Sequence, residues 1–193
     1  MIAIGLTGLA RSGKDTAAAW LVEHHGFTRF AFADIMKDAV YTLDPLVEVS
    51  DPADLGGLHM HARLSQVVDT YGWEGAKDYP DVRRLLQRFG TEMGRGLFGE
   101  DFWVDLMAHR VAQADPPGGI VFTDVRFANE ADKVCNHFGG YVVRIVRPSV
   151  EGLPGETGRH ASEALDLEAD ITIINDGTPD DLGRRLSAVI NAL

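Results

Sequence analysis

The sequence has one cysteine, no excess of positive charge and no long apolar run, and each shortage excludes a class of protein. Cys135 alone cannot form a disulfide within the chain, and it is interpreted as a small apolar side chain. A net charge of −11 argues against general binding to nucleic acid polymers. No apolar run approaches the about 20 residues of a membrane span. The opening stretch, Met1–Thr7, is too short for a signal peptide and lacks its basic region. We therefore expect a cytosolic protein with neither a membrane nor a nucleic acid polymer as partner.

Apolar runs and helical spacing alternate along the chain. Strands are predicted at Ile2–Thr7, Thr28–Ala33, Ile120–Thr123, Tyr141–Val146 and Ile171–Ile174. Helices are predicted at Lys14–His25, from an N-cap at Asp34 to about Leu43, at about 59–72, 81–97 and 101–114, at Asn129–Phe138, and at Pro179–Leu193, with a loop at 45–58. This order predicts a single α/β domain over 1–193, with three α/β/α layers around a five-stranded parallel sheet. Ligands of such sheets bind at the carboxyl ends of the strands.

The strongest motif runs from Gly8 to Thr16 and reads Gly-Leu-Ala-Arg-Ser-Gly-Lys-Asp-Thr. It matches the P-loop pattern G-x-x-x-x-G-K and lies between a predicted strand and a predicted helix. The glycines let successive N–H groups point into one concavity, and Lys14 adds a charge for the β- and γ-phosphates. The alternative is a glycine-rich turn that only caps a helix. The motif predicts an ATP site at Gly8, Arg11, Ser12, Gly13, Lys14 and Thr16.

Two carboxylates are candidates for Mg²⁺. Asp15 stands where a P-loop normally has Ser or Thr, and a carboxylate is also a hard oxygen ligand. Asp124 ends the predicted strand at Ile120–Thr123, where P-loop proteins place a carboxylate that orients the metal. We predict that Asp15, Thr16 and Asp124 organise Mg²⁺. Asp15 could instead serve as a base or orienting group, and Asp124 could be an ordinary cap or turn residue.

Arginines near the predicted sheet edge are candidates for neutralising phosphate charge. Arg126 follows Asp124, and Arg147 follows the strand at Tyr141–Val146, whereas Arg144 could face the other side of that strand. Arg159 lies in a Gly/Pro-rich stretch that we interpret as a lid at about 148–162. The predicted catalytic residues are Lys14, Asp15, Asp124, Arg126 and Arg147.

Acceptor-binding candidates lie between the second and third predicted strands. Lys37 could meet an acceptor phosphate one helical turn after Asp34, or the two could be a surface lysine and a cap. Arg88 could point into an acceptor cleft or pair with Glu92. Trp103 could stack on a base, although such aromatics more often pack in a core. With Arg126, the predicted acceptor-binding set is Asp34, Lys37, Arg88, Trp103 and Arg126.

Several of these segments together resemble the phage-type deoxynucleoside monophosphate kinases. The resemblance rests on Arg11–Thr16, Ala33–Lys37, Leu86–Glu92, Asp101–Trp103, Thr123–Glu130, His160–Glu163 and Ile174–Thr178. It implies an adenylate-kinase-like fold with an acceptor-binding region at approximately 34–114 and the lid. It implies transfer from MgATP to a deoxynucleoside monophosphate (dNMP), giving a diphosphate and ADP. It also places Asn175 in a loop that binds the nucleotide base, and implies a homodimer, in a host cytoplasm if the gene is a phage gene.

Other readings of the P-loop remain open at this level. Within kinases, the alternatives are dephospho-coenzyme A kinase and phosphomevalonate kinase, since the latter has a similar Ser-Gly-Lys-Asp. A nucleotide-dependent switch or motor ATPase is an alternative of another class, although the chain lacks the N-K-x-D segment with which GTPases read guanine. A catalytically silent nucleotide-binding module is disfavoured by the carboxylates and arginines.

Overall fold

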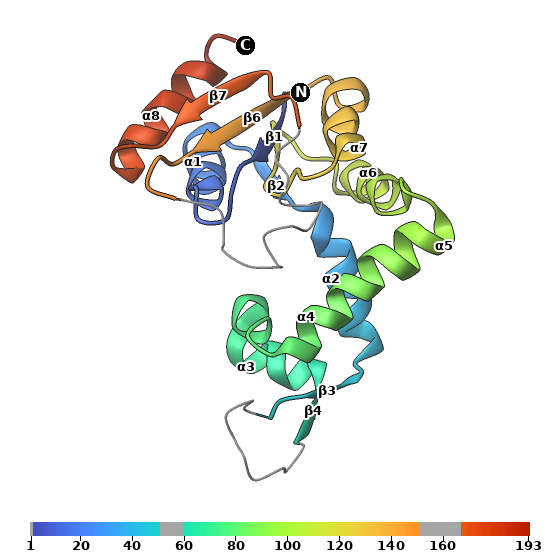
Figure 1. Ribbon diagram of the computed structural model, residues 1–193. Helices are drawn as coiled ribbons and strands as arrows, with labels where there is room; N and C mark the ends of the chain where they lie inside the picture. The colour runs from blue at the N-terminus through green and yellow to red at the C-terminus, as the bar shows by residue number, and fades with distance from the viewer. Residues whose placement is uncertain (1, 51–59, 151–166) are drawn as a thin grey trace. The chain divides into compact units, whose positions relative to one another are not determined.

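The computed structural model describes residues 2–50, 60–150 and 167–193 (Figure 1). The chain forms two compact units. We call Met1–Phe32 with Leu106–Leu193 the sheet unit, and Ala33–Asp105 the helical unit. None of the helices in the described ranges has the length and apolar character needed to cross a bilayer.

The sheet unit contains the predicted five-stranded parallel sheet. Its strands are β1 (Ala3–Thr7), β2 (Thr28–Phe30), β5 (Ile120–Phe122), β6 (Tyr141–Val146) and β7 (Ile171–Ile174), in the order β2-β5-β1-β6-β7. All four pairings are parallel, and β1 lies at the centre, with Ala3 opposite Ile120 and Ile4 opposite Tyr141. Every residue of β1 is buried. The carboxyl ends of β1 and β5 therefore open onto the same edge.

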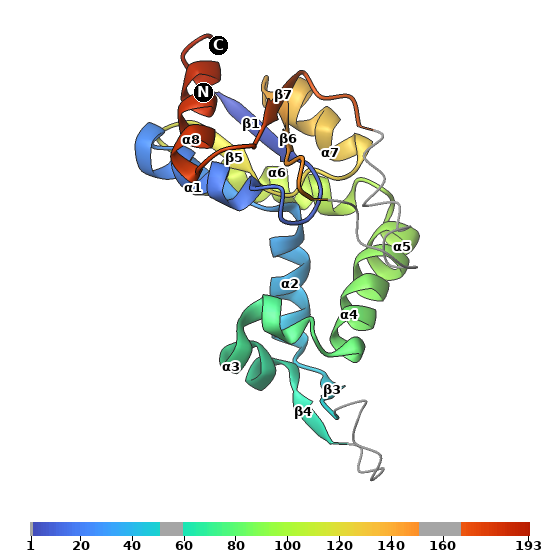
Figure 2. The same cartoon turned by 60° about the vertical axis from the view of Figure 1, so that its left-hand side comes forward.

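Helices cover both faces of this sheet, as predicted (Figures 1 and 2). Helices α1 (Lys14–His25) and α8 (Pro179–Ile190) pack on one face through a core that includes Leu6, Leu21 and Leu186. Helix α7 (Ala128–Asp132) continues into the π-helix η2 (Lys133–His137) on the other face. There the absence of a side chain at Gly5 admits Val125 and Val134, since an added Cβ would lie 2.9 Å from Val125 and 3.1 Å from Val134.

The second strand and the helix after it differ from the prediction. Strand β2 ends at Phe30, and α2 (Phe32–Leu43) begins before Asp34, which lies in its first turn and is not the N-cap. The backbone N–H of Phe32 donates to Asp124 Oδ1 at 2.8 Å, so a carboxylate distant in sequence caps the helix. The Phe32 ring also stacks on Phe122, with centroids 4.9 Å apart. These contacts cannot be read from local sequence.

The helical unit contains most of α2, a two-stranded antiparallel sheet and further helices. Its other elements are β3 (Leu46–Glu48), β4 (His61–Arg63), α3 (Leu64–Ala76), α4 (Pro80–Gln87), the π-helix η1 (Arg88–Arg95), α5 (Gly96–Phe98) and the start of α6 (Phe102–Ala114). Two predictions were wrong here. Residues 46–48 of the predicted loop form β3, and residues 61–63 of the predicted helix form β4, with Leu46 opposite Arg63. Val47 of β3 is buried in a cluster with Val40 and Leu64. This burial favours the pairing of such short strands and is not visible in the local sequence.

Residues 80–98 form the helical run that was predicted at 81–97, but its middle part is a π-helix. Trp103 Nε1 donates to the carbonyl of Gly90 at 2.8 Å, and the indole lies directly over Gly94. A Cβ added at Gly94 would lie 2.2 Å from Trp103 Nε1. Gly94 is therefore a packing position where the helix backbone meets the indole.

Candidate active site

The loop after β1 has the backbone of a phosphate cradle. Gly8, Arg11 and Gly13 have φ values of 143°, 63° and 108°, so two glycines and one arginine adopt positive φ within six residues. The N–H of Ser12 donates to Leu9 O at 3.2 Å, which closes the turn. Helix α1 then starts from Gly13 with no side-chain cap on its first N–H groups. Uncapped N–H groups at a helix N-terminus favour an anion.

Both glycines of the motif are also required for space. A Cβ at Gly8 would lie 2.3 Å from Ile145 O, and one at Gly13 would lie 2.5 Å from Asn175 Nδ2. Neither neighbour is a flexible side-chain end, because one is backbone and the other is a buried amide. The loop thus packs tightly on the ends of β6 and β7.

Lys14 lies inside the cradle. Its ammonium donates to the carbonyls of Gly8 and Leu9, both at 2.8 Å. Burial lowers the pKa of Lys14 below its ordinary value, and the positive charge of Arg126 lowers it further, whereas Asp15 and Asp124 act in the opposite direction. The structure therefore brings together four of the five predicted catalytic residues. Asp15 is next to Lys14 in the chain, whereas Asp124 and Arg126 come from the segment that follows β5.

Asp124 combines two roles that the sequence left as alternatives. Its Oδ1 accepts the N–H of Phe32, the first residue of α2, so it is a cap. It also lies close enough to Lys14 to influence the pKa of the ammonium. The carboxylate is half-buried at the sheet edge, where it can both fix local backbone and contribute charge to the cradle.

Asn175 contacts the loop and is almost fully buried. Its side-chain Nδ2 donates to Ser12 O at 2.8 Å, and its backbone N–H donates to Val146 O at 2.7 Å. The sequence suggested contact with the nucleotide base, which stays a prediction. What the structure describes is a brace between the residue after β7 and the P-loop, two segments 163 residues apart. Sequence reasoning missed this bracing role because no local pattern pairs the two segments.

Two buried hydroxyls at the cradle provide a test of whether the loop fits a phosphate ligand. Thr7 Oγ1 and Ser12 Oγ are buried and have no hydrogen-bond partner within the described part of the chain. Buried polar atoms are normally satisfied, so such atoms beside uncapped N–H groups fit a polar ligand. Lys14 and Arg126 match the charge of a triphosphate. The residues present therefore fit ATP.

The carboxylates fit a metal ion that the nucleotide would also ligate. In the residues that the structure covers, no cluster of three or more His, Cys, Asp or Glu side chains could hold a metal alone. Mg²⁺ is commonly bound through one or two carboxylates, with phosphate oxygens and waters completing the octahedron. Asp15, exposed in the first turn of α1, and Asp124 match that donor set.

The remaining arginines differ in their surroundings. Arg147 follows the carboxyl end of β6 and is exposed, so its catalytic role stays a prediction. Arg144 lies within β6 and donates to the carbonyl of Leu167, and its position relative to the phosphates stays a prediction. Arg159, and the predicted lid from residue 151 onward, lie outside the described residues.

The acceptor candidates Asp34, Lys37, Arg88 and Trp103 belong to the helical unit. Lys37 pairs with Asp34 at 3.9 Å and lies 6.0 Å from the Trp73 ring centroid. Arg88 pairs with Glu92 at 3.1 Å, the alternative that the sequence left open. Trp103 is 6% exposed, so its geometry supports packing, and the predicted stacking on a base is not supported.

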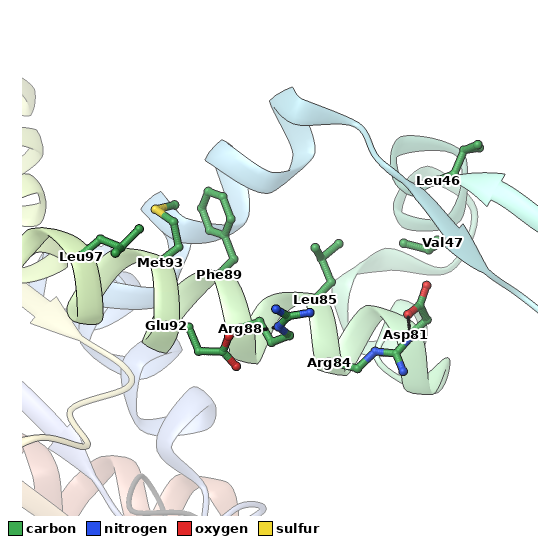
Figure 3. A pocket seen from close by; sticks show the side chains of 10 residues that line it. All are labelled: Leu46, Val47, Asp81, Arg84, Leu85, Arg88, Phe89, Glu92, Met93 and Leu97. Atoms are coloured by element: carbon green, nitrogen blue, oxygen red, sulfur yellow. Dashed lines mark hydrogen bonds and ion pairs between the residues drawn. The ribbon is translucent and has the colours of Figure 1, made fainter.

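A groove of about 660 Å³ runs along this unit (Figure 3). It is lined by Leu46, Val47, Asp81, Arg84, Leu85, Arg88, Phe89, Glu92, Met93 and Leu97. Apolar side chains at four-residue spacing form one wall, and the Arg88–Glu92 and Arg84–Asp81 pairs border it. Arg88 is thus an acceptor candidate that lines this groove.

Comparison with known proteins agrees with this site. A family model described as deoxynucleotide monophosphate kinase matches residues 54–186. A protein of Acanthamoeba polyphaga mimivirus assigned as a deoxynucleotide monophosphate kinase is 31% identical over 219 residues, covering 100% of this chain and 98% of that protein. The deoxynucleoside-5′-monophosphate kinase of Escherichia phage T5 is 30% identical over 224 residues, covering 82% of this chain and 88% of that protein.

Among solved structures, the protein TT1252 of Thermus thermophilus superposes with a TM-score of 0.50 at 18% identity, covering 100% of this chain and 97% of that one. That likeness concerns the fold. The family model matches well over half of the chain, and the two viral relatives span most of it. The chain therefore belongs to the deoxynucleotide monophosphate kinase family.

Proposed function

We propose that this protein transfers the γ-phosphoryl group of ATP to a deoxynucleoside monophosphate, giving the diphosphate and ADP. The observation that carries the proposal is the convergence on one P-loop of Lys14, Arg126, Asp15 and Asp124, seen in the electrostatic surroundings of the ammonium. Family membership supports the choice of acceptor.

The chain's own residues would act by position and charge. The N–H groups at the start of α1 and the loop bind the triphosphate, and Lys14 exchanges the carbonyls of Gly8 and Leu9 for phosphate oxygens. Arg126 and Arg147 neutralise the charge that develops on the transferred group, which is the dominant effect in phosphoryl transfer. No covalent enzyme intermediate is needed.

Asp15, Thr16 and Asp124 would hold Mg²⁺, directly or through water. When bound, the ion neutralises charge on the β- and γ-phosphates. Asp34, Lys37 and Arg88 are proposed to contact the acceptor, and Arg159 to act from the lid. We further propose that the enzyme is a homodimer that works in the cytoplasm.

An acceptor screen tests the proposal. Purified protein with MgATP is offered dNMPs, ribonucleoside monophosphates, dephospho-coenzyme A and phosphomevalonate, and ADP release is followed. We expect ADP release that depends on a dNMP. Release with only dephospho-coenzyme A or phosphomevalonate would reassign the acceptor, and ADP release without any acceptor would indicate a motor or switch ATPase.

A further inference from the structure

A buried carboxylate holds the turn that carries Asp124 and Arg126. Glu130 is 5% exposed, and one oxygen, Oε2, accepts the backbone N–H of Arg126 at 2.8 Å and that of Phe127 at 3.1 Å. An ionised carboxylate is costly to bury unless hydrogen bonds compensate it. These two N–H groups therefore help to compensate the buried carboxylate, which is their acceptor.

The turn is fixed at both ends. Before Arg126, the N–H of Val125 donates to Leu6 O at 3.1 Å, which extends the β1–β5 pairing, and Val125 is buried. On the other side, the Glu130 carboxylate holds the N–H of Arg126 itself and that of Phe127, the residue before α7. The backbone of Arg126 is thus fixed from both sides, and its side chain extends from a defined point beside Lys14.

We propose that Glu130 is a positioning residue for phosphoryl transfer and acts through Arg126. This inference rests on the proposed function. Without the carboxylate, two N–H groups lose their acceptor and the turn can relax. Displacement of a catalytic group by about 1 Å can cost about a hundredfold in rate. We expect Glu130→Ala to lower kcat at least about tenfold. KM for ATP should change by less than about twofold, because the two N–H groups that Glu130 accepts belong to the turn after β5 and not to the P-loop.

Two conservative variants of Glu130 distinguish the effect of side-chain length from the effect of negative charge. Gln keeps an acceptor oxygen at the same distance but has no charge, whereas Asp keeps the charge and is one methylene shorter. We expect Glu130→Gln to retain kcat within about threefold and Glu130→Asp to lose about tenfold. The reverse order would overturn the proposal. This comparison decides the question even where Glu130→Ala does not fold.

A double-mutant cycle tests whether the effect passes through Arg126. In an Arg126→Met background, Glu130→Asp should cause little further loss of kcat, because the group it positions is already gone. Full additivity of the two losses would overturn the proposal and leave a purely structural role. Gln66→Ala is the matched control. Gln66 accepts the N–H of Arg63 at 3.2 Å at the start of α3, the same capping interaction on an exposed surface, and its loss should leave kcat unchanged.

The outcomes for Glu130 are distinct from those for the proposed function. All variants are compared with the unaltered protein on whichever acceptor supports ADP release. If no dNMP is phosphorylated, the proposed function fails first. If the unaltered protein is active and the variants break the expected order, only the role of Glu130 fails.

Discussion

The two units use their polar side chains differently. In the sheet unit, buried or half-buried groups bind the backbone: Asp124 holds Phe32, Glu130 holds Arg126, and Asn175 holds Ser12. In the helical unit, many charged side chains pair with one another, as in Arg84–Asp81, Arg88–Glu92 and Lys77–Glu74. Asp44 and Asp81, which accept backbone N–H groups there, are not fully buried. Exposed pairs contribute only about 0.2–1 kcal/mol each, whereas an orphaned buried group costs about 1–3 kcal/mol.

The same contrast appears in the apolar side chains. Strand β1 is buried throughout, while the helical unit exposes Leu46, Leu97 and Phe98 at 58%, 75% and 62%. Buried side chains are thus concentrated where phosphates are proposed to bind, and exposed apolar side chains such as Leu46 and Leu97 line the groove of Figure 3. Substitutions in the sheet unit should therefore mainly lower kcat, whereas substitutions in the helical unit should mainly change stability or KM for the acceptor.

The largest expected effect is that of Lys14→Ala. Removing a preorganised charge at the transferring phosphate costs about a hundredfold or more in kcat. The fold should persist, because the described hydrogen bonds of the ammonium are to the carbonyls of Gly8 and Leu9 alone. ADP release measures the loss of kcat, and thermal unfolding measures whether the fold persists. Lys77→Ala, which removes the partner of the exposed Glu74, is the control. Preserved turnover in Lys14→Ala would contradict the assignment.

Asn175→Ala should weaken the cradle and the fold together. The carbonyl of Ser12 loses its buried donor, which costs about 1–3 kcal/mol of unfolding free energy. We expect kcat to fall about tenfold as the loop relaxes. Urea unfolding and steady-state kinetics check the two effects. Asn191→Ala, at the exposed end of α8, should change neither. An Asn175→Ala protein with unaltered stability would remove the bracing role.

Gly94→Ala should destabilise the helical unit by about 1–3 kcal/mol, because the new Cβ meets the Trp103 indole and overpacks the core. Gly96→Ala is the matched control, since its Cβ would meet nothing nearer than Thr91 O at 3.5 Å. That change should stabilise by up to about 1 kcal/mol through helix propensity. Urea denaturation distinguishes them, and equal effects would show that the indole contact has no energetic weight.

Arg88→Met should raise KM for the dNMP by up to about fivefold and leave KM for ATP unchanged. The estimate follows from an exposed charge contact of about 1 kcal/mol. Arg84→Met is the control, because Arg84 lines the same groove and has its own carboxylate partner, Asp81. Acceptor and donor titrations with both variants provide the measurement. Identical effects of the two substitutions would deny Arg88 a specific part in acceptor binding.

The smallest expected effect is a shift in the alkaline limb of the pH profile. The charged form of Lys14 binds the triphosphate, so kcat/KM for ATP should fall as pH rises through its pKa. Burial and Arg126 lower this pKa, and the fall should therefore begin below the ordinary value of 10.5. Arg126→Met removes one positive neighbour, which should move the limb to higher pH. A limb that moves to lower pH in that variant would contradict the described electrostatics.

The contrast between the units also explains what the sequence could predict. In the sheet unit, α1, β6 and β7 were predicted with their observed bounds, since apolar runs and Gly26 mark their ends locally. The P-loop and Asp124 could likewise be recognised, because each directly follows a predicted strand. In the helical unit, β3 and β4 were missed because their pairing depends on burial of Val47. In the sheet unit, the bracing of Ser12 by Asn175 was missed because it joins segments far apart in the sequence.

Asp124 performs two duties with one side chain, and this restricts how the protein can change. Its carboxylate caps the first residue of α2 and lends charge to Lys14. A substitution that alters the charge also alters where α2 begins, unless the replacement can still accept the Phe32 N–H. Asparagine keeps an acceptor oxygen for this N–H and removes the charge, whereas alanine removes both. Only Asp124→Asn therefore tests the effect of the charge on Lys14 without removing the helix cap. A replacement of Asp124 that keeps the function unchanged must therefore preserve both the cap on α2 and the negative charge near Lys14.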